Sequence, residues 1–227
     1  MPDRKADGLQ GKVKEVVQEY VLVNFENGNQ TGSKRLISSV TEYDQNGNRI
    51  KRASYSSGKL ASKTKYGLLN GEKISIEERI EDKDNPPIFQ TPSVKSTANK
   101  PADNRYNYKF KYNYDDKGNR IEEFWIENDG DLWIRDVITF ENGKVTKSIR
   151  YHRGEDKISS KVRYEYDEKG RLKKQIHLNP DDTETEKHEP MKFDSQGNWI
   201  EERVSKPDRF GNFQVFLIGY RKITNFQ

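Results

Sequence analysis

A five-residue element recurs four times in this sequence and constrains its fold more than any other feature. It consists of an aromatic residue, Asp, two variable residues and Gly, and its copies begin at Tyr43, Tyr114, Tyr166 and Phe193. In such a segment the Asp carboxylate accepts hydrogen bonds from backbone N–H groups two or three residues on, and Gly adopts the positive φ that closes a tight turn. Ile or Leu follows within three residues of each Gly and begins the returning strand. Each copy therefore predicts a β-hairpin.

Looser turn signals fill the intervals between the strict copies. They are Asn27-Gly28, Ser57-Gly58, Asn70-Gly71, Asp129-Gly130, Asn142-Gly143, Arg153-Gly154, Asp181-Asp182 and Phe210-Gly211. From Gly118 onward the turn glycines recur about every 26 residues with two turns per period, which indicates strands of roughly eight to ten residues. We predict an all-β protein, an extended antiparallel β-meander of stacked hairpins with about fourteen strands. Because open sheets beyond about ten strands curl or split, we expect a curved open sheet or a barrel-like closure.

One stretch interrupts this rhythm. Residues 82–104 contain Pro86, Pro87, Pro92 and Pro101, a composition that excludes a central strand and favours an extended loop. We predict N-terminal hairpins over 1–81, a Pro-rich loop or linker over 82–104, and C-terminal hairpin repeats over 105–227, joined in one continuous sheet. The loop either separates two subassemblies of that sheet or is an ordered functional loop.

Composition narrows the class of protein. Only 31% of residues are hydrophobic and 34% are charged, yet there are twelve Tyr, ten Phe and three Trp, which favours a thin, solvated β-structure over disorder. Basic residues form no dense run, so we expect no nucleic-acid partner. No apolar stretch reaches the length of a membrane span, so we expect no membrane insertion. The absence of Cys excludes disulfides and thiolate chemistry.

The turn itself resembles the YD-repeat (RHS-type repeat) family of bacterial proteins. The resemblance covers the four strict copies and degenerate ones across most of residues 33–205, and the closing segment 219–226 is similar to the ending of short secreted or periplasmic members. It implies a β-hairpin strip, outside the cytoplasm, in a surface or envelope protein. Large members form a shell around a toxin domain, and this chain is too short for that role. The first residues contain no apolar signal region, which leaves a cytoplasmic location open.

The residues that carry chemistry give no catalytic pattern. His152, His177 and His188 are the only histidines, and their spacing in the sequence is not that of a metal site, so we interpret them as isolated strand or surface residues. There is no Gly-x-Ser-x-Gly nucleophile elbow and no phosphate-binding Gly-rich loop. We expect no catalytic residue, no metal and no cofactor, and therefore no enzyme.

The aromatic residues are the one feature that suggests a ligand. A row at every second position shares one face of a strand and consists of Tyr106, Tyr108, Phe110, Tyr112 and Tyr114; we interpret it as the apolar layer of the sheet itself. Trp125 and Trp133 should face each other across a hairpin and are the candidate ligand-binding residues. We predict a non-enzymatic secreted or cell-envelope module that acts as a structural or protein-binding surface. The alternative is a glycan-binding module that uses the aromatic rows.

Overall fold

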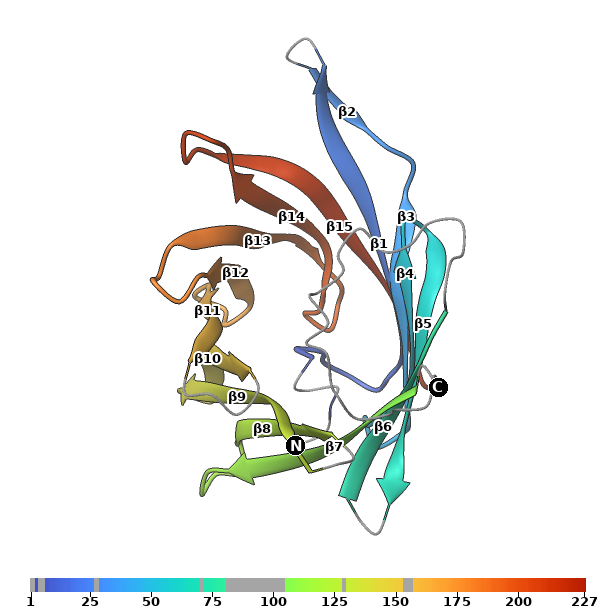
Figure 1. Cartoon of the computed structure of the whole chain (residues 1–227). Helices are drawn as coiled ribbons and strands as arrows, with labels where there is room; N and C mark the ends of the chain where they lie inside the picture. Colours follow the sequence, from blue (N-terminus) through green and yellow to red (C-terminus); the bar gives the residue numbers. More distant parts are fainter. Residues whose placement is uncertain are drawn as a thin grey trace, which may run out of the picture.

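The computed structural model describes residue 3 and residues 7–26, 29–69, 72–80, 105–127, 130–152 and 157–227. These residues form fifteen β-strands (Figure 1). The first eight are β1 (Val13–Glu26), β2 (Asn29–Gly32), β3 (Leu36–Tyr43), β4 (Arg49–Ser56), β5 (Lys59–Leu69), β6 (Glu72–Arg79), β7 (Arg105–Tyr114) and β8 (Arg120–Glu127). The others are β9 (Leu132–Glu141), β10 (Lys144–His152), β11 (Ile158–Tyr166), β12 (Leu172–Leu178), β13 (Glu184–Phe193), β14 (Trp199–Pro207) and β15 (Phe213–Asn225).

The strands form a closed wall. From β3 onward each strand pairs antiparallel with the next, and β15 pairs with β1. β2 and β3 both pair with β1, one beyond the other along its length, so the fifteen strands occupy fourteen positions in the wall. The protein is therefore an all-β, closed antiparallel meander β-barrel (Figure 1). The predicted meander and its barrel-like closure are confirmed.

The Pro-rich segment and some of the predicted turns fall outside the residues that the structure describes. The Pro-rich segment at 82–104 lies outside the described residues, as do the turn signals at 27–28, 70–71 and 153–154. On either side of the Pro-rich segment, β6 pairs directly with β7, so residues 72–79 and 105–114 are neighbours in the wall. No helix in the described part of the chain is long and apolar enough to cross a membrane.

The strict turns share one hydrogen-bonded geometry. In the turn between β7 and β8, Oδ1 of Asp115 accepts hydrogen bonds from the backbone N–H groups of Lys117 (3.0 Å) and Asn119 (2.8 Å). The carboxylate thus caps residues two and four positions on, where two or three were expected. The amide of Asn119 donates to Oδ2 of Asp115 at 2.8 Å, which explains why Asn follows Gly in three of the four copies. Gly118 has φ 77°, in the left-handed region that the motif predicts.

The strict turns also lie at one end of the barrel. They join β3 to β4, β7 to β8, β11 to β12 and β13 to β14. Because alternate turns of an antiparallel meander lie at the same end, all four lie where β1 begins and β15 ends. The backbone N–H of Phe226 donates to the carbonyl of Lys12 at 2.8 Å and closes the seam at that end.

The N-terminal residues lie across this end of the barrel. Asp7 accepts two hydrogen bonds from the guanidinium of Arg49 on β4 and one, at 2.6 Å, from the hydroxyl of Tyr43 on β3. Gln10 bonds Asn198, in the turn between β13 and β14. These two sets of contacts lie on either side of the seam between β1 and β15. Figure 1 shows the start of the chain inside the ring of strands. Within the described residues this segment also carries the main apolar cluster, formed by Leu9, Val13, Val16 and Tyr43 with Ile223 beside it.

Asp3 anchors the same segment to two further strands. It is only 3% exposed and pairs with Lys73 of β6 and, at 3.5 Å, with Arg120 of β8. Burial by itself raises the pKa of Asp3, but the Lys73 ammonium and the Arg49 backbone N–H outweigh it, so the pKa is lowered. The carboxylate is therefore ionised and compensates two buried cations. This segment and its partners mark the inner face of the wall.

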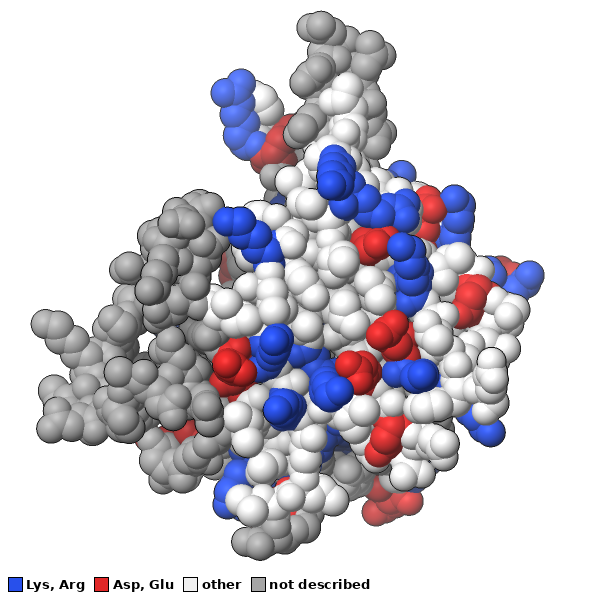
Figure 2. Space-filling view, turned by 90° about the vertical axis from the view of Figure 1, so that its right-hand side faces the viewer, with Lys and Arg blue, Asp and Glu red and all other residues white. Residues whose placement is uncertain are grey.

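The outer face follows from the alternation of side chains along each strand. Lys73 is an inner residue, and its register partner Phe110 and the next partner Trp125 share its face. The intervening positions point outward, and in much of the wall they are charged. Figure 2 shows basic and acidic side chains interspersed over the outer face of one side of the barrel.

Backbone strain at the turn glycine gives a direct test of this geometry. A Cβ atom at Gly118 would have nothing within 4 Å, so a substitution there acts only through the positive φ. We expect Gly118→Val to lower the free energy of unfolding by about 1–3 kcal/mol in a denaturant titration. Lys117→Ala, at the preceding exposed position, is the control and should cost much less. Equal losses at both positions would show that the turn is assigned wrongly.

The N-terminal crossing makes a second prediction. Asp7→Ala removes the acceptor of Arg49 and Tyr43 and leaves a mostly buried guanidinium without its partner. We expect a loss of about 3 kcal/mol in the free energy of unfolding, the size found when one partner of a buried ion pair is removed. The matched control is Asp116→Ala, which removes an exposed carboxylate from a turn. A loss no greater than the control's would mean that the N-terminal segment does not hold the barrel end.

Candidate functional site

The aromatic row of β7 lies on the inner wall at Tyr108, Phe110 and Tyr112. Phe110 is only 7% exposed, and its ring contacts Trp125 edge-on at 5.3 Å and stacks with Tyr112 at 6.5 Å. The Arg120 guanidinium lies 3.9 Å above the Tyr112 ring. Edge-on, stacked and cation–π contacts of this kind stabilise a wall from within.

The two tryptophans predicted as ligand-binding residues do not face each other. The Glu127 N–H donates to the Asp131 carbonyl, the closure expected for a three-residue loop. Trp125 nevertheless pairs with Ile134, because the register shifts by one residue between Ile126, which pairs with Leu132, and Trp125. Trp125 donates from Nε1 to Glu123 at 2.8 Å, and the Trp133 ring packs edge-on against His152 at 4.6 Å. Both indole rings are half-buried, and their role in binding stays a prediction.

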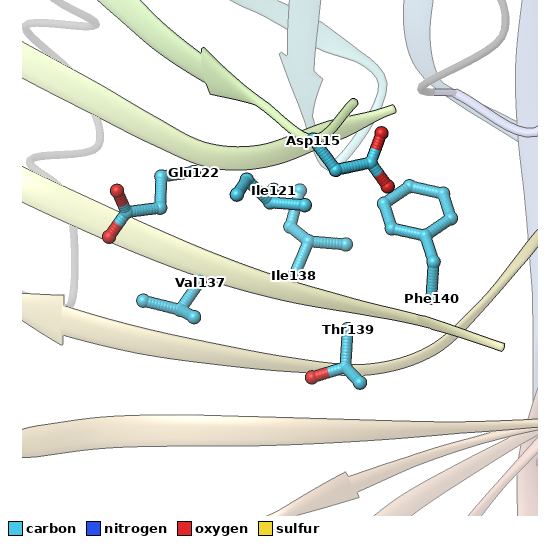
Figure 3. A pocket seen from close by; sticks show the side chains of 7 residues that line it. All are labelled: Asp115, Ile121, Glu122, Val137, Ile138, Thr139 and Phe140. Atoms are coloured by element: carbon cyan, nitrogen blue, oxygen red, sulfur yellow. The ribbon is translucent and has the colours of Figure 1, made fainter. Parts of the chain in front are cut away.

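A shallow hollow of about 410 Å³ lies over β8 and β9 (Figure 3). Its lining is Asp115, Ile121, Glu122, Val137, Ile138, Thr139 and Phe140. Figure 3 shows the Asp115 carboxylate and the Phe140 ring at one end and Glu122 with Val137 at the other. Both carboxylates already have partners, since Asp115 caps its turn and Glu122 binds Arg135 and Asn113. The hollow is therefore mainly an apolar surface.

A second group of inner-wall side chains has the chemistry of a binding site. The rings of His177 on β12 and His188 on β13 lie 5.1 Å apart. Nε2 of His188 lies 2.6 Å from Oε1 of Glu186, and its Nδ1 lies 3.2 Å from Oε2 of Glu202 on β14. We call these four residues the histidine–carboxylate cluster. Their proximity corrects the interpretation of His177 and His188 as isolated residues.

The charges in the cluster are set by its contacts. Burial by itself lowers the pKa of His188, but the hydrogen bonds to Glu186 and Glu202 raise it to about 9. The bond to His188 lowers the pKa of Glu186 to about 2. Burial lowers the pKa of His177, and the charge on His188 lowers it further. At neutral pH the cluster therefore contains one imidazolium, one neutral imidazole and ionised Glu186.

The cluster borders a cavity of about 240 Å³, to whose lining Glu186, His188 and Glu202 all contribute. The neighbouring strand β15 leaves space for the Glu202 side chain, because the register partner of Glu202 on that strand is Gly219. A Cβ atom at Gly219 would lie 2.9 Å from Cγ of Glu202, so any other residue would displace that carboxylate. The absence of a side chain at one position of β15 thus keeps Glu202 against His188.

The sequence did contain a signal for this cluster. His177 and His188 flank the Asp181-Asp182 turn, and a hairpin there brings their strands together. The exact register, Gln175 opposite His188 and His177 opposite Glu186, depends on an irregularity between His177 and Leu178 that the sequence does not reveal.

Comparison with known proteins defines the chain by its fold alone. No known family model and no curated protein matches the sequence, so the resemblance to the YD-repeat family remains a prediction. The fold is similar to that of a porin-like protein from Bacteroides uniformis, at TM-score 0.51 and 9% identity over 95% of this chain and 99% of that chain. The class supported is therefore a closed antiparallel β-barrel.

Two further likenesses are weaker. A DUF1329 family protein from Desulfovibrio piger aligns with 96% of this chain and 87% of that chain, at TM-score 0.40 and 11% identity. Part of a Tc toxin complex, TcdB2-TccC3-Cdc42, aligns with 85% of this chain and 11% of that chain, at TM-score 0.24 and 14% identity. At these TM-scores neither supports an inference about this chain.

The raised pKa of His188 predicts a pH dependence of stability. A group whose pKa is higher in the folded state stabilises fully below its unfolded value, near 6.5, and loses that contribution as the pH rises through about 9. We expect the stability difference between the native protein and His188→Gln to shrink by on the order of 3 kcal/mol from about pH 6 to about pH 10. Denaturant titrations at several pH values measure it. A difference that does not change with pH would contradict the assigned imidazolium.

Proposed function

We propose that this chain is a non-enzymatic β-barrel module of the bacterial cell envelope, secreted or periplasmic, which acts as a structural or protein-binding surface. The observation that carries the proposal is the charged outer wall. Glu189 on β13 pairs with Lys174 of β12 at 3.4 Å and with Arg203 of β14 at 2.9 Å, so outward positions in mid-wall carry a cross-strand ion-pair network. A barrel that spans a bilayer presents an apolar band at such positions.

The same pattern occurs at the closure seam. Glu19 on β1 accepts a hydrogen bond from Lys222 of β15 at 3.0 Å and another from Arg35 at 3.3 Å. Exposed ion pairs of this kind contribute little to stability individually, but charged outward positions favour a wall surrounded by water. An aqueous barrel with a polar, mixed-charge exterior fits a surface for protein contacts better than a membrane pore.

The envelope location is supported by the resemblance to the YD-repeat family and by the description of the Bacteroides uniformis neighbour as porin-like. The non-enzymatic character is supported by the state of the inner polar groups. Asp3, Asp7 and Glu186 are each held in ion pairs with inner cations. Such groups have the role of charge compensation inside the wall.

Fractionation of bacteria that express the gene encoding this chain tests the proposal. We expect the protein in the periplasmic or extracellular fraction, and in neither the cytoplasm nor the membranes that remain after alkaline washing. Recovery in the cytoplasm would overturn the envelope location. Recovery in washed outer membranes would overturn the aqueous wall.

A glycan-binding role is the second candidate, favoured by the inner row of Phe110, Tyr112 and Trp125, because aromatic rings can stack on sugars. This role predicts that soluble polysaccharide shifts the tryptophan fluorescence of the native protein and that Trp125→Phe reduces the shift. Trp133→Phe tests the other predicted ring, on the neighbouring strand, in the same way. If no polysaccharide changes the emission, the rings are the wall's own apolar layer and this candidate fails.

A further inference from the structure

The histidine–carboxylate cluster has a second capacity besides ion pairing. One ligand atom from each of His177, Glu186 and His188 lies within 4.8 Å of the other two. We infer that these three side chains form a binding site for a divalent transition-metal ion of the zinc type. This inference concerns the inner wall and does not depend on the location or partner proposed for the barrel.

The donor set and its spacing fit such an ion. Two imidazole nitrogens and one carboxylate oxygen form a ligand set typical of zinc sites with three protein ligands. Zinc–ligand bonds of about 2.0–2.1 Å in tetrahedral geometry place ligand atoms roughly 3.3 Å apart. In the cluster His188 and Glu186 are 2.6 Å apart and no pair of ligand atoms is more than 4.8 Å apart, which is close to that value. Small side-chain rotations are therefore enough to close the site.

Glu202 would orient one of the ligands. Its Oε2 lies 3.2 Å from Nδ1 of His188, while Nε2 of the same ring is directed at Glu186. A proton on Nδ1 donated to Glu202 leaves Nε2 as the metal-binding atom, an arrangement that recurs around metal-bound histidines and fixes their tautomer. Gly219, by leaving space for Glu202, belongs to the same support.

The site also has room for a further ligand. The cavity of about 240 Å³ reaches Glu186 and His188, so a water molecule or a ligand atom can approach the position that the three side chains leave open. Three protein ligands with an open fourth position distinguish a binding or catalytic centre from a closed structural one. The metal would thus offer the barrel interior a point of attachment for an anionic or carbonyl group.

The Lys206 ammonium and the proton on His188 both compete with the metal. Nζ of Lys206, on β14, lies 3.1 Å from Oε2 of Glu186, and His188 must lose its proton before Nε2 can bind. Outside the cluster itself, Gln175 on β12 also contacts it, with its Nε2 2.8 Å from Nε2 of His177. Each bound ion should therefore release about one proton at neutral pH, and the affinity should rise between about pH 6 and pH 9.

Calorimetric titration of the untagged, chelator-treated protein with zinc chloride tests the site. We expect one ion per chain and, from titrations in two buffers of different ionisation enthalpy, release of about one proton. His177→Ala should weaken binding by at least about tenfold, since it removes a ligand, while the salt bridges of His188 keep the fold. His152→Ala is the matched control, because that ring lies against Trp133 on another part of the wall.

Lys206→Met gives a gain that a purely structural ion-pair cluster would not show. Removing the competing ammonium should tighten zinc binding, and cobalt titrated in place of zinc should give a visible absorption band in the native protein and not in His177→Ala. Circular dichroism and melting of each variant confirm that it is folded. Absence of zinc binding by the native protein, or equal weakening in His152→Ala and His177→Ala, would overturn the inference.

Discussion

The hydrogen-bond ladder between β1 and β15 is the interaction on which the rest of the structure depends. Every other strand pair is local in sequence, whereas this ladder joins residues about two hundred positions apart, from Glu15 opposite Thr224 to Leu22 opposite Leu217. Without it, two long strands would present unpaired backbone groups at open edges, which invite association with other chains. Closure removes both edges and gives the wall an inside. Because the ladder is long-range, it pays loop-closure entropy that the hairpins do not, and we expect it to form late in folding.

Closure of the wall encloses many charged side chains in the barrel interior. Each of them therefore needs a partner of opposite charge there. At the end where the termini meet, cations predominate: Arg49, Lys73 and Arg120 project inward and receive Asp3 and Asp7 from the N-terminal segment. On the strands near the C-terminus, acidic residues gather around His188. Of the ten buried apolar side chains in the described residues, four cluster under the N-terminal crossing and the others are distributed around the wall. The barrel is thus held by hydrogen bonds and compensated charges more than by a thick apolar core, as its composition indicates.

The features that were predictable from sequence are the local ones. The Asp-x-x-Gly turns, their positive φ and the antiparallel meander follow from residues that lie within five positions of one another, as at Asp115 and Asn119. Features that depend on non-local register were not predictable. Closure at β1–β15 could only be offered as one of two outcomes. The approach of His177 to His188 depends on an irregularity in the pairing of β12, and Trp125 faces Ile134 because of an irregularity in the pairing of β8 with β9. The contacts of Asp3 and Asp7 carry no local signal at all.

The repeated unit in this chain is a hairpin, and that has an evolutionary consequence. A hairpin contributes two strands, so duplication or loss of one unit changes the wall by an even number and leaves the first and last strands antiparallel. Because the strict turns share one end, a new unit joins its neighbours there without altering the seam between β1 and β15. A single duplication or deletion of one hairpin would therefore change the diameter of the barrel and still yield a chain whose first and last strands can pair.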